Sequence, residues 1–134
     1  MGHDQSAWVC HAIEHEVCAY YNITHGVGLA ILTPPFMGYT LTEDAVDRFA
    51  QSGEKVWEMP PADDKMKTAL EAIKKTEEFF KSIGMPSKLS ELGITEEHFE
   101  DMATHIKKHW FAPLTIAPRP ADHAGILEIL RNSL

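Results

Sequence analysis

Apolar residues recur three and four positions apart along nearly the whole of this chain, and no stretch alternates as a half-buried strand does. This spacing predicts an all-α protein, a helical bundle formed by one domain over residues 1–134. The expected helices cover residues 5–21, 24–40, 42–57, 64–83, 95–109 and 121–134.

Start and stop signals separate these helices. Asn22 is expected to end the first helix in a left-handed conformation, and Thr24 to cap the second. Asp63 or Asp64 should cap the long fourth helix, which Gly84 stops ahead of a proline. A short helical turn is expected in the stretch KLSELGI, and a proline-rich loop over residues 112–120.

Two of the helices allow predictions about burial. The second contains the apolar run GVGLAIL and is expected to be buried on all sides, with Pro34 and Pro35 kinking it or ending its first half. The fourth is amphipathic, and its inner face is expected to be formed by Ala69, Leu70, Ile73, Phe80 and Ile83.

Charge and composition exclude several classes of function. The formal net charge is −8, which disfavours nucleic acid or an anionic membrane as a partner. No apolar run approaches the ~20 residues that cross a bilayer, and no secretory leader opens the sequence. Cys10 and Cys18 lie eight residues apart on one expected helix, too far for a disulfide. We therefore expect reduced thiols and a cytoplasmic protein.

The stretch HAIEH places His11 and His15 four residues apart, on one face of a helix, where two imidazoles could meet one metal ion. The same letters fit the inverted zinc-protease motif H-x-x-E-H, with Glu14 as general base. That interpretation needs another acidic ligand, for which Glu71, Glu77 and Glu78 are available. His25 follows in NITHGVG as a third candidate ligand. The residues alone leave these alternatives open.

A second group of histidines lies near one face of the fifth expected helix. His98, His105 and His109 are spaced by seven and four residues, among acidic and basic neighbours. We interpret them as surface histidines and not as a second metal site.

The frame H-x3-H-x9-H-G, formed by His11, His15, His25 and Gly26, is much more specific. Embedded in HAIEHEVCAYYNITHGVGLAILTP, it resembles the iron-containing (group III) alcohol dehydrogenase family, most closely the butanol dehydrogenase branch. The stretches DRFAQSGEKVW, ALEAIKKTEEFFKSIGMPSKLSELGI and ILEILRNSL resemble the C-terminal portion of that family in the same order. The likeness is weakest over residues 101–120.

The resemblance implies a specific division of roles. It makes His11 and His25 the metal ligands, one on each of two helices, and places His15 in the catalytic cleft as a proton relay. Its implied cofactors are NAD(P) and a divalent metal, iron(II) or zinc, since neutral imidazole suits both. The implied reaction is hydride transfer between NAD(P) and a small primary alcohol or its aldehyde. A homo-oligomer is also compatible with the family.

Two parts of that family's machinery are missing from this sequence. The family's other two ligands are an aspartate and a histidine four residues apart on an earlier helix, and the only such pair here is Asp101 and His105. No glycine-rich turn follows a strand to bind a dinucleotide, so the cofactor-binding residues are unknown. We therefore expect the chain to be a C-terminal fragment, inactive alone and holding metal weakly or not at all. A stand-alone helical binding or assembly module is the alternative.

Overall fold

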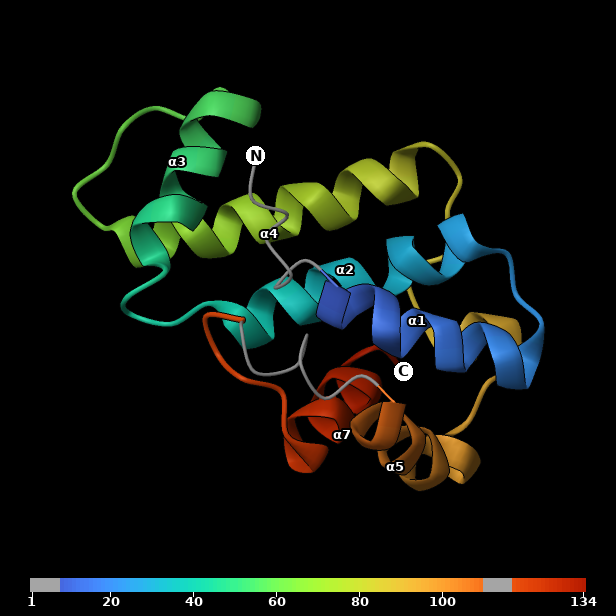
Figure 1. The fold of residues 1–134 in the computed structure, drawn as a ribbon. Coiled ribbons are helices and arrows are strands. Elements are labelled where there is room, and N and C mark those ends of the chain that lie inside the picture. Colours follow the sequence, from blue (N-terminus) through green and yellow to red (C-terminus); the bar gives the residue numbers. More distant parts are fainter. Residues whose placement is uncertain (1–7, 110–116) are drawn as a thin grey trace, which may run out of the picture.

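The computed structural model describes residues 8–109 and 117–134, and within these ranges it contains helices and no strand (Figure 1). The helices are α1 (Trp8–Tyr21), α2 (His25–Thr40), α3 (Val46–Val56), α4 (Lys65–Ser82), α5 (Phe99–His109) and α7 (His123–Asn132), with 3-10 turns η2 (Leu89–Leu92) and η3 (Glu96–His98). The all-α prediction is confirmed. Residues 5–7 of the first expected helix and 112–116 of the expected loop lie outside the described residues.

The helices form two packed groups that share α2. In Figure 1, α1 lies along α2, and α5 and α7 lie together beneath them. The helices α3 and α4 pack against each other at a steep angle, and α4 joins this pair to the rest of the molecule through α2. The core lies where α1, α2, α5 and α7 meet, and its largest fully buried apolar side chains are Ile13, Ile31, Leu32, Leu89, Phe99, Met102, Ile106, Ile126, Ile129 and Leu130.

Most helix boundaries follow the signals read from the sequence. Asn22 has a φ of 50° and ends α1, and Gly84 has a φ of 83° and follows α4. The Asp64 side chain accepts a hydrogen bond of 2.9 Å from the backbone N–H of Lys67, as expected of a cap. The third helix begins later than expected, because residues 43–45 form a turn ahead of Val46.

The prolines of α2 do not end it, contrary to one of the two outcomes expected for them. The helix continues through Pro34 and Pro35 to Thr40. Each proline removes one backbone N–H, but burial of Ile31, Leu32 and Tyr39 holds both halves of the helix against the core. The expected complete burial of α2 is only partly right, since Gly26 is exposed and Val27 and Leu29 are half-buried.

The inner face expected for α4 is wrong at two positions. Ala69 is buried, whereas Leu70 is 55% exposed and Ile83 is 54% exposed. The side of α4 that packs on α3 is instead formed by small residues. A Cβ atom on Gly53 of α3 would lie 3.2 Å from the Thr68 side chain and 3.4 Å from that of Ala72. Thr68 and Ala72 therefore face α3 at close range, whereas the larger Leu70 lies on a side of α4 that is open to solvent.

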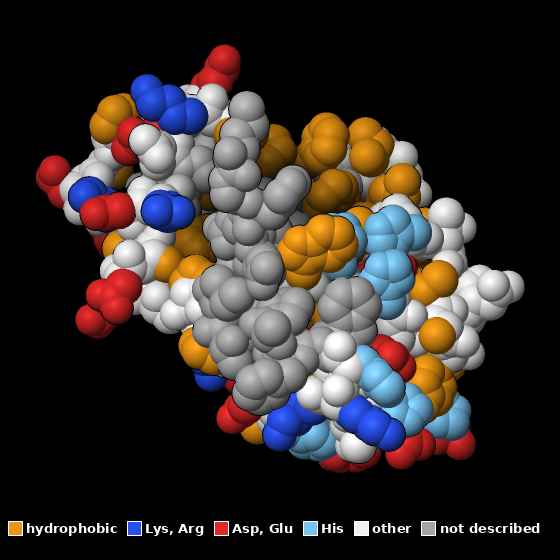
Figure 2. All heavy atoms as spheres, viewed as in Figure 1, with side chains coloured by type: hydrophobic (Ala, Val, Ile, Leu, Met, Phe, Trp, Pro, Cys, Tyr) orange, Lys and Arg blue, Asp and Glu red, His pale blue; other side chains and the backbone are white. Residues whose placement is uncertain are grey.

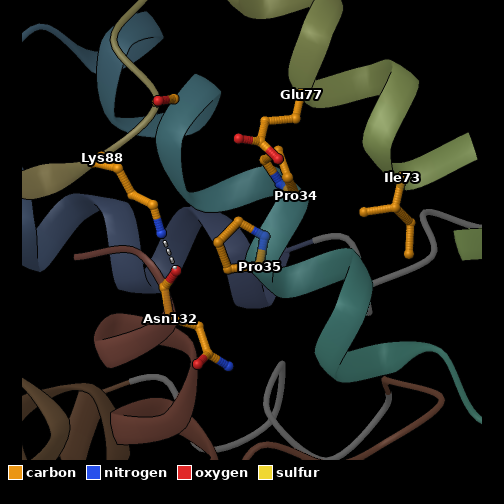
Figure 3. Close-up of a pocket in the computed structure, with 7 residues that line it drawn as sticks. Pro34, Pro35, Ile73, Glu77, Lys88 and Asn132 are labelled. Carbon is orange, nitrogen blue, oxygen red and sulfur yellow. Dashed lines mark hydrogen bonds between the residues drawn. The ribbon is translucent and has the colours of Figure 1, made fainter. Parts of the chain in front are cut away.

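A pocket of about 210 Å³ lies between α2, α4 and the chain end, lined by Pro34, Pro35, Ile73, Glu77, Ser87, Lys88 and Asn132 (Figure 3). Its lysine is already engaged, since Lys88 Nζ donates a 3.1 Å hydrogen bond to the Asn132 carbonyl. The pocket contains none of the candidate site histidines. None of the described helices is long and apolar enough to cross a membrane.

Candidate metal centre

The turn between α1 and α2 brings the three histidines of the HAIEH and NITHG stretches together. α1 ends at Tyr21, Asn22 reverses the chain, and Thr24 precedes His25 as the N-cap of α2. The Cys18 thiol donates a 3.0 Å hydrogen bond to the Ile23 carbonyl inside this turn. The two helices then run side by side (Figure 1), so the first turn of α2 lies against the middle of α1.

His25 lies between the two histidines of α1. Its ring centroid is 5.4 Å from that of His11, with the two planes tilted by 51°. It is 5.5 Å from that of His15, with the planes nearly parallel at 24°. Figure 2 shows histidine side chains gathered on this face of the molecule, over α1 and the start of α2. The residues fourteen apart in sequence, His11 and His25, are therefore neighbours in space.

Glu14 is the most unusual residue of this region. It lies on α1 between His11 and His15, yet its side chain is fully buried. Its Oε2 forms a short hydrogen bond with Nδ1 of His25, whose side chain is 49% exposed. Its Oε1 has no hydrogen-bond partner in the part of the chain that the structure describes. A buried carboxylate thus lies directly behind the imidazole of His25.

Gly28 makes the room for that carboxylate. A Cβ atom at this position would lie 2.7 Å from Cγ and 2.8 Å from Oε1 of Glu14. No Cβ fits at such distances unless a neighbour moves, so only glycine permits Glu14 to lie between α1 and α2. Gly26, two residues earlier, has no atom within 4 Å of its hypothetical Cβ.

Two further side chains adjoin the histidines. The indole of Trp8, 46% exposed, lies with its centroid 5.5 Å from that of His11. Cys10 is buried, and burial raises the pKa of its thiol to about 11. A hydrogen bond between the thiol and the Thr33 hydroxyl lowers this pKa, and the nearby Glu14 charge raises it. This thiol therefore stays protonated near neutral pH and is a poor metal ligand. Cys10 and Cys18 are both free, as expected.

Sequence reasoning had assigned Glu14 only to the protease alternative, as a general base, and the structure contradicts that role. A base must reach a water molecule, but Glu14 is inaccessible to solvent and bonded to His25. Two of the acids considered as a further ligand are paired elsewhere, Glu77 with Lys81 at 2.6 Å and Glu78 with Lys74 at 3.7 Å.

The two histidines of α5 lie on the surface, whereas His98, the last residue of η3, is partly covered. His105 and His109 are exposed, as predicted, and His105 Nδ1 is 3.6 Å from Glu16. His98 is half-buried, with its ring centroid 5.2 Å from that of Tyr20. Asp101 and His105, the only pair with the spacing of the missing ligands, belong to this exposed face of α5.

The side chains gathered here can supply some, but not all, of the ligands of a metal ion. His11 and His25 provide two imidazoles from two helices, and the buried charge of Glu14 adjoins one of them. Across residues 8–109 and 117–134, no group of three or more His, Cys, Asp or Glu side chains is placed to hold a metal ion. Any ion held here therefore needs ligands beyond those of the described residues.

Comparison with known protein families gives a match over almost the whole chain. Residues 2–134 match the family described as Fe-containing alcohol dehydrogenase family, C-terminal. Among characterised proteins, NADH-dependent butanol dehydrogenase A of Clostridium acetobutylicum is 44% identical over 133 residues, covering 99% of this chain and 34% of the relative. Butanol dehydrogenase B of the same organism, also NADH-dependent, is 41% identical, covering 95% of this chain and 33% of the relative.

The fold agrees with solved structures of similar proteins. The crystal structure of NADH-dependent butanol dehydrogenase A from Thermotoga maritima superposes with a TM-score of 0.81 at 26% identity. The match covers 94% of this chain and 32% of that protein. The chain thus spans about a third of the length of the curated relatives it matches.

Proposed function

Because this chain belongs to the Fe-containing alcohol dehydrogenase family, we propose that it forms the C-terminal metal-site region of an NAD(P)-linked alcohol dehydrogenase. The reaction in the intact enzyme is hydride transfer between a small primary alcohol and NAD(P), giving the aldehyde. One observation supports this proposal most directly. The ring centroids of His11 and His25 lie 5.4 Å apart, and both residues belong to the H-x3-H-x9-H-G pattern that resembles the family. The butanol dehydrogenase names of the similar proteins support an alcohol of that class.

His11 and His25 are the proposed metal ligands. They come from two helices, so a shared ion fixes the angle between α1 and α2 as well as the site itself. Neutral imidazole nitrogen suits iron(II) and zinc alike. A bound divalent ion supplies Lewis-acid polarisation of the alcohol oxygen.

His15 is the proposed catalytic residue. It is exposed and its ring stacks on His25, one helical turn from His11. A side chain in this position can accept the alcohol proton and pass it to solvent, as a general base does. Its proposed role is therefore in proton transfer and not in holding the metal.

The dinucleotide is bound by other parts of the intact enzyme. The described residues form helices and connecting segments without a strand, and none of them forms the strand and glycine-rich turn that cradle a pyrophosphate. We propose that residues 1–134 act as a domain within a longer enzyme, hold metal weakly alone and are inactive alone.

The proposed partners and location follow from charge and chemistry. A net charge of −8 disfavours nucleic acid, and the proposed ligand is a small alcohol or aldehyde. Two free thiols suit the reducing cytoplasm. The exposed apolar side chains Val56, Leu70 and Ile83 suit a homo-oligomer or contact with further parts of the enzyme.

The experiment that tests the proposal is a chimera. The last third of Clostridium acetobutylicum butanol dehydrogenase A, to which this chain is 44% identical, is replaced by residues 1–134. We expect the purified chimera to reduce butanal with NADH, and the His11→Ala variant to lose at least about 100-fold in kcat. A folded chimera without activity contradicts the dehydrogenase proposal and favours the alternative, a helical binding module.

A further inference from the structure

Glu14 is the only carboxylate or basic side chain that is buried in the described part of the chain. Burying a carboxylate is costly unless hydrogen bonds or an opposite charge compensate for lost hydration. Here one oxygen bonds His25 and the other has no partner among the described residues. An apolar side chain of the same length would fill this space without that cost. Packing therefore does not explain why a carboxylate lies here.

The contact with His25 does explain it. An ionised carboxylate has lone pairs and no proton, so it can only accept. Opposite an ionised Glu14, it is Nδ1 of His25 that carries the hydrogen and donates it to Oε2. In the neutral imidazole this leaves Nε2 as the nitrogen with a free lone pair. A carboxylate behind a metal-ligating histidine characteristically fixes the tautomer and orientation of its ring.

We propose that Glu14 is a positioning residue for His25. Its buried carboxylate holds the Nδ1–H tautomer, so that Nε2 is the ligating nitrogen, and its charge attracts the cation that two neutral imidazoles cannot balance. Gly28 completes the arrangement, since any larger residue there displaces Glu14. This inference rests on the proposed function, in which His25 is a metal ligand.

Glu16 provides a matched control on the same helix. Its side chain is half-buried, at 17% exposed, and its Oε2 lies 3.6 Å from Nδ1 of His105. Glu16→Gln changes the net charge as Glu14→Gln does, but it does not touch His25. Because both variants remove one negative charge, a difference between their zinc affinities reflects where that charge lies and not the change in net charge.

The experiment uses the whole 134-residue chain, labelled with 15N in its histidine rings. Ring nitrogen shifts report the tautomer of His25 in the metal-free protein, and titration with zinc chloride, followed at His11, gives the metal affinity. The variants are Glu14→Met, which matches the size of the side chain but accepts no hydrogen bond, and Glu14→Gln, which keeps an acceptor oxygen but no charge. Thermal unfolding checks each fold.

We expect His25 to show the Nδ1–H tautomer in the unmodified chain and to lose this preference in Glu14→Met. Zinc affinity should fall by about 10–100-fold in Glu14→Met, the range typical for such outer partners. Glu14→Gln should retain more of the tautomer preference than Glu14→Met while losing affinity. The melting temperature of Glu14→Met should stay equal or rise, an outcome that a purely structural role for Glu14 does not produce.

Failure of the inference about Glu14 can be distinguished from failure of the proposed metal site. An Nε2–H tautomer at His25 in the unmodified chain overturns the inference, whatever the metal result. Unchanged zinc affinity in Glu14→Met, beside a loss in His25→Ala, also overturns it while the proposed function survives. If His25→Ala itself leaves zinc binding at His11 unchanged, His25 is no ligand and the proposed site is wrong.

Discussion

The rings of His11 and His25 lie with their centroids 5.4 Å apart, although fourteen residues and a helix reversal separate them. His15 is the closer residue in sequence, one helical turn from His11, but it contacts His25 by stacking at 5.5 Å. The structure thus gathers the three side chains with His25 in the middle. This arrangement is compatible with the pairing that the family resemblance implies.

Alanine substitutions at Gly28 and Gly26, in the first turn of α2, should have different effects on the free energy of unfolding. Gly28→Ala places a Cβ 2.7 Å from Glu14 Cγ, and relief by movement of α1 or Glu14 should cost about 1–3 kcal/mol of unfolding free energy. Gly26→Ala meets nothing within 4 Å and should be neutral or stabilising by up to about 1 kcal/mol. Urea unfolding measures both. Equal stabilities would show that α1 and α2 do not approach as closely as described.

The buried thiol of Cys10 should make the protein lose stability at alkaline pH. Its pKa is raised from 9.0 to about 11, so above pH 9 the unfolded chain releases a proton that the folded chain keeps. The free energy of unfolding then falls as pH rises from 9 to 11, by up to about 2–3 kcal/mol. Cys10→Ala should flatten this part of the pH profile.

The denaturant midpoint between pH 8 and 11 is the measurement for Cys10. Tyrosines also titrate in this window, with burial raising the pKa values of Tyr20, Tyr21 and Tyr39. The difference between the unmodified chain and Cys10→Ala cancels their contribution. Parallel profiles for these two proteins would mean that the thiol is accessible to water.

The exposed apolar side chains of α4 and its C-cap should cause self-association. Leu70 is 55% and Ile83 54% exposed, and Phe79 lies between them in sequence at 45%. Ile83→Lys should shift the chain towards monomer in sedimentation velocity runs at increasing concentration. Its unfolding free energy should change by less than about 0.5 kcal/mol, because the position is on the surface. Lys74→Gln on the same helix is the control, and an unmodified chain that stays monomeric throughout would refute this expectation.

The isolated chain should neither bind NADH or NADPH nor oxidise butanol. Helices without a glycine-rich turn after a strand offer no site for the pyrophosphate. Fluorescence titration with NADH, together with a butanol assay at added zinc or iron(II), measures both properties. Turnover by the purified 134-residue chain would contradict the assignment of cofactor binding to other parts of the enzyme.

Helix positions could be predicted from local chemistry, because their signals act over a few residues. Asp64, Asn22 and Gly84 mark helix ends through hydrogen bonds or backbone angles that do not depend on distant packing. The exposed side of α4 could not be predicted in this way. It depends on Gly53 of α3, whose missing side chain lets small residues of α4 pack inward and leaves Leu70 outside.

The spacing of the three histidines predicts the candidate site from the sequence, but the burial of Glu14 was not predicted. A carboxylate between two histidines suggests an exposed face, and the charge pattern alone supports that interpretation. One signal was present, since Glu14 follows Cys10 by four residues and precedes Val17 by three, which places it on the apolar face of α1. Gly28, the residue that makes room for it, is fourteen positions away and has no local signature.

The metal content of the purified chimera, measured by inductively coupled plasma mass spectrometry in three single variants, tests the central claim most directly. If His11 and His25 are the ligands, His11→Ala and His25→Ala should each retain less than about a tenth of the metal. His15→Ala should keep most of the metal while losing turnover, as a proton relay requires. Loss of metal from His15→Ala with retention in His25→Ala would contradict the account, and would assign the ion to the neighbouring pair on α1.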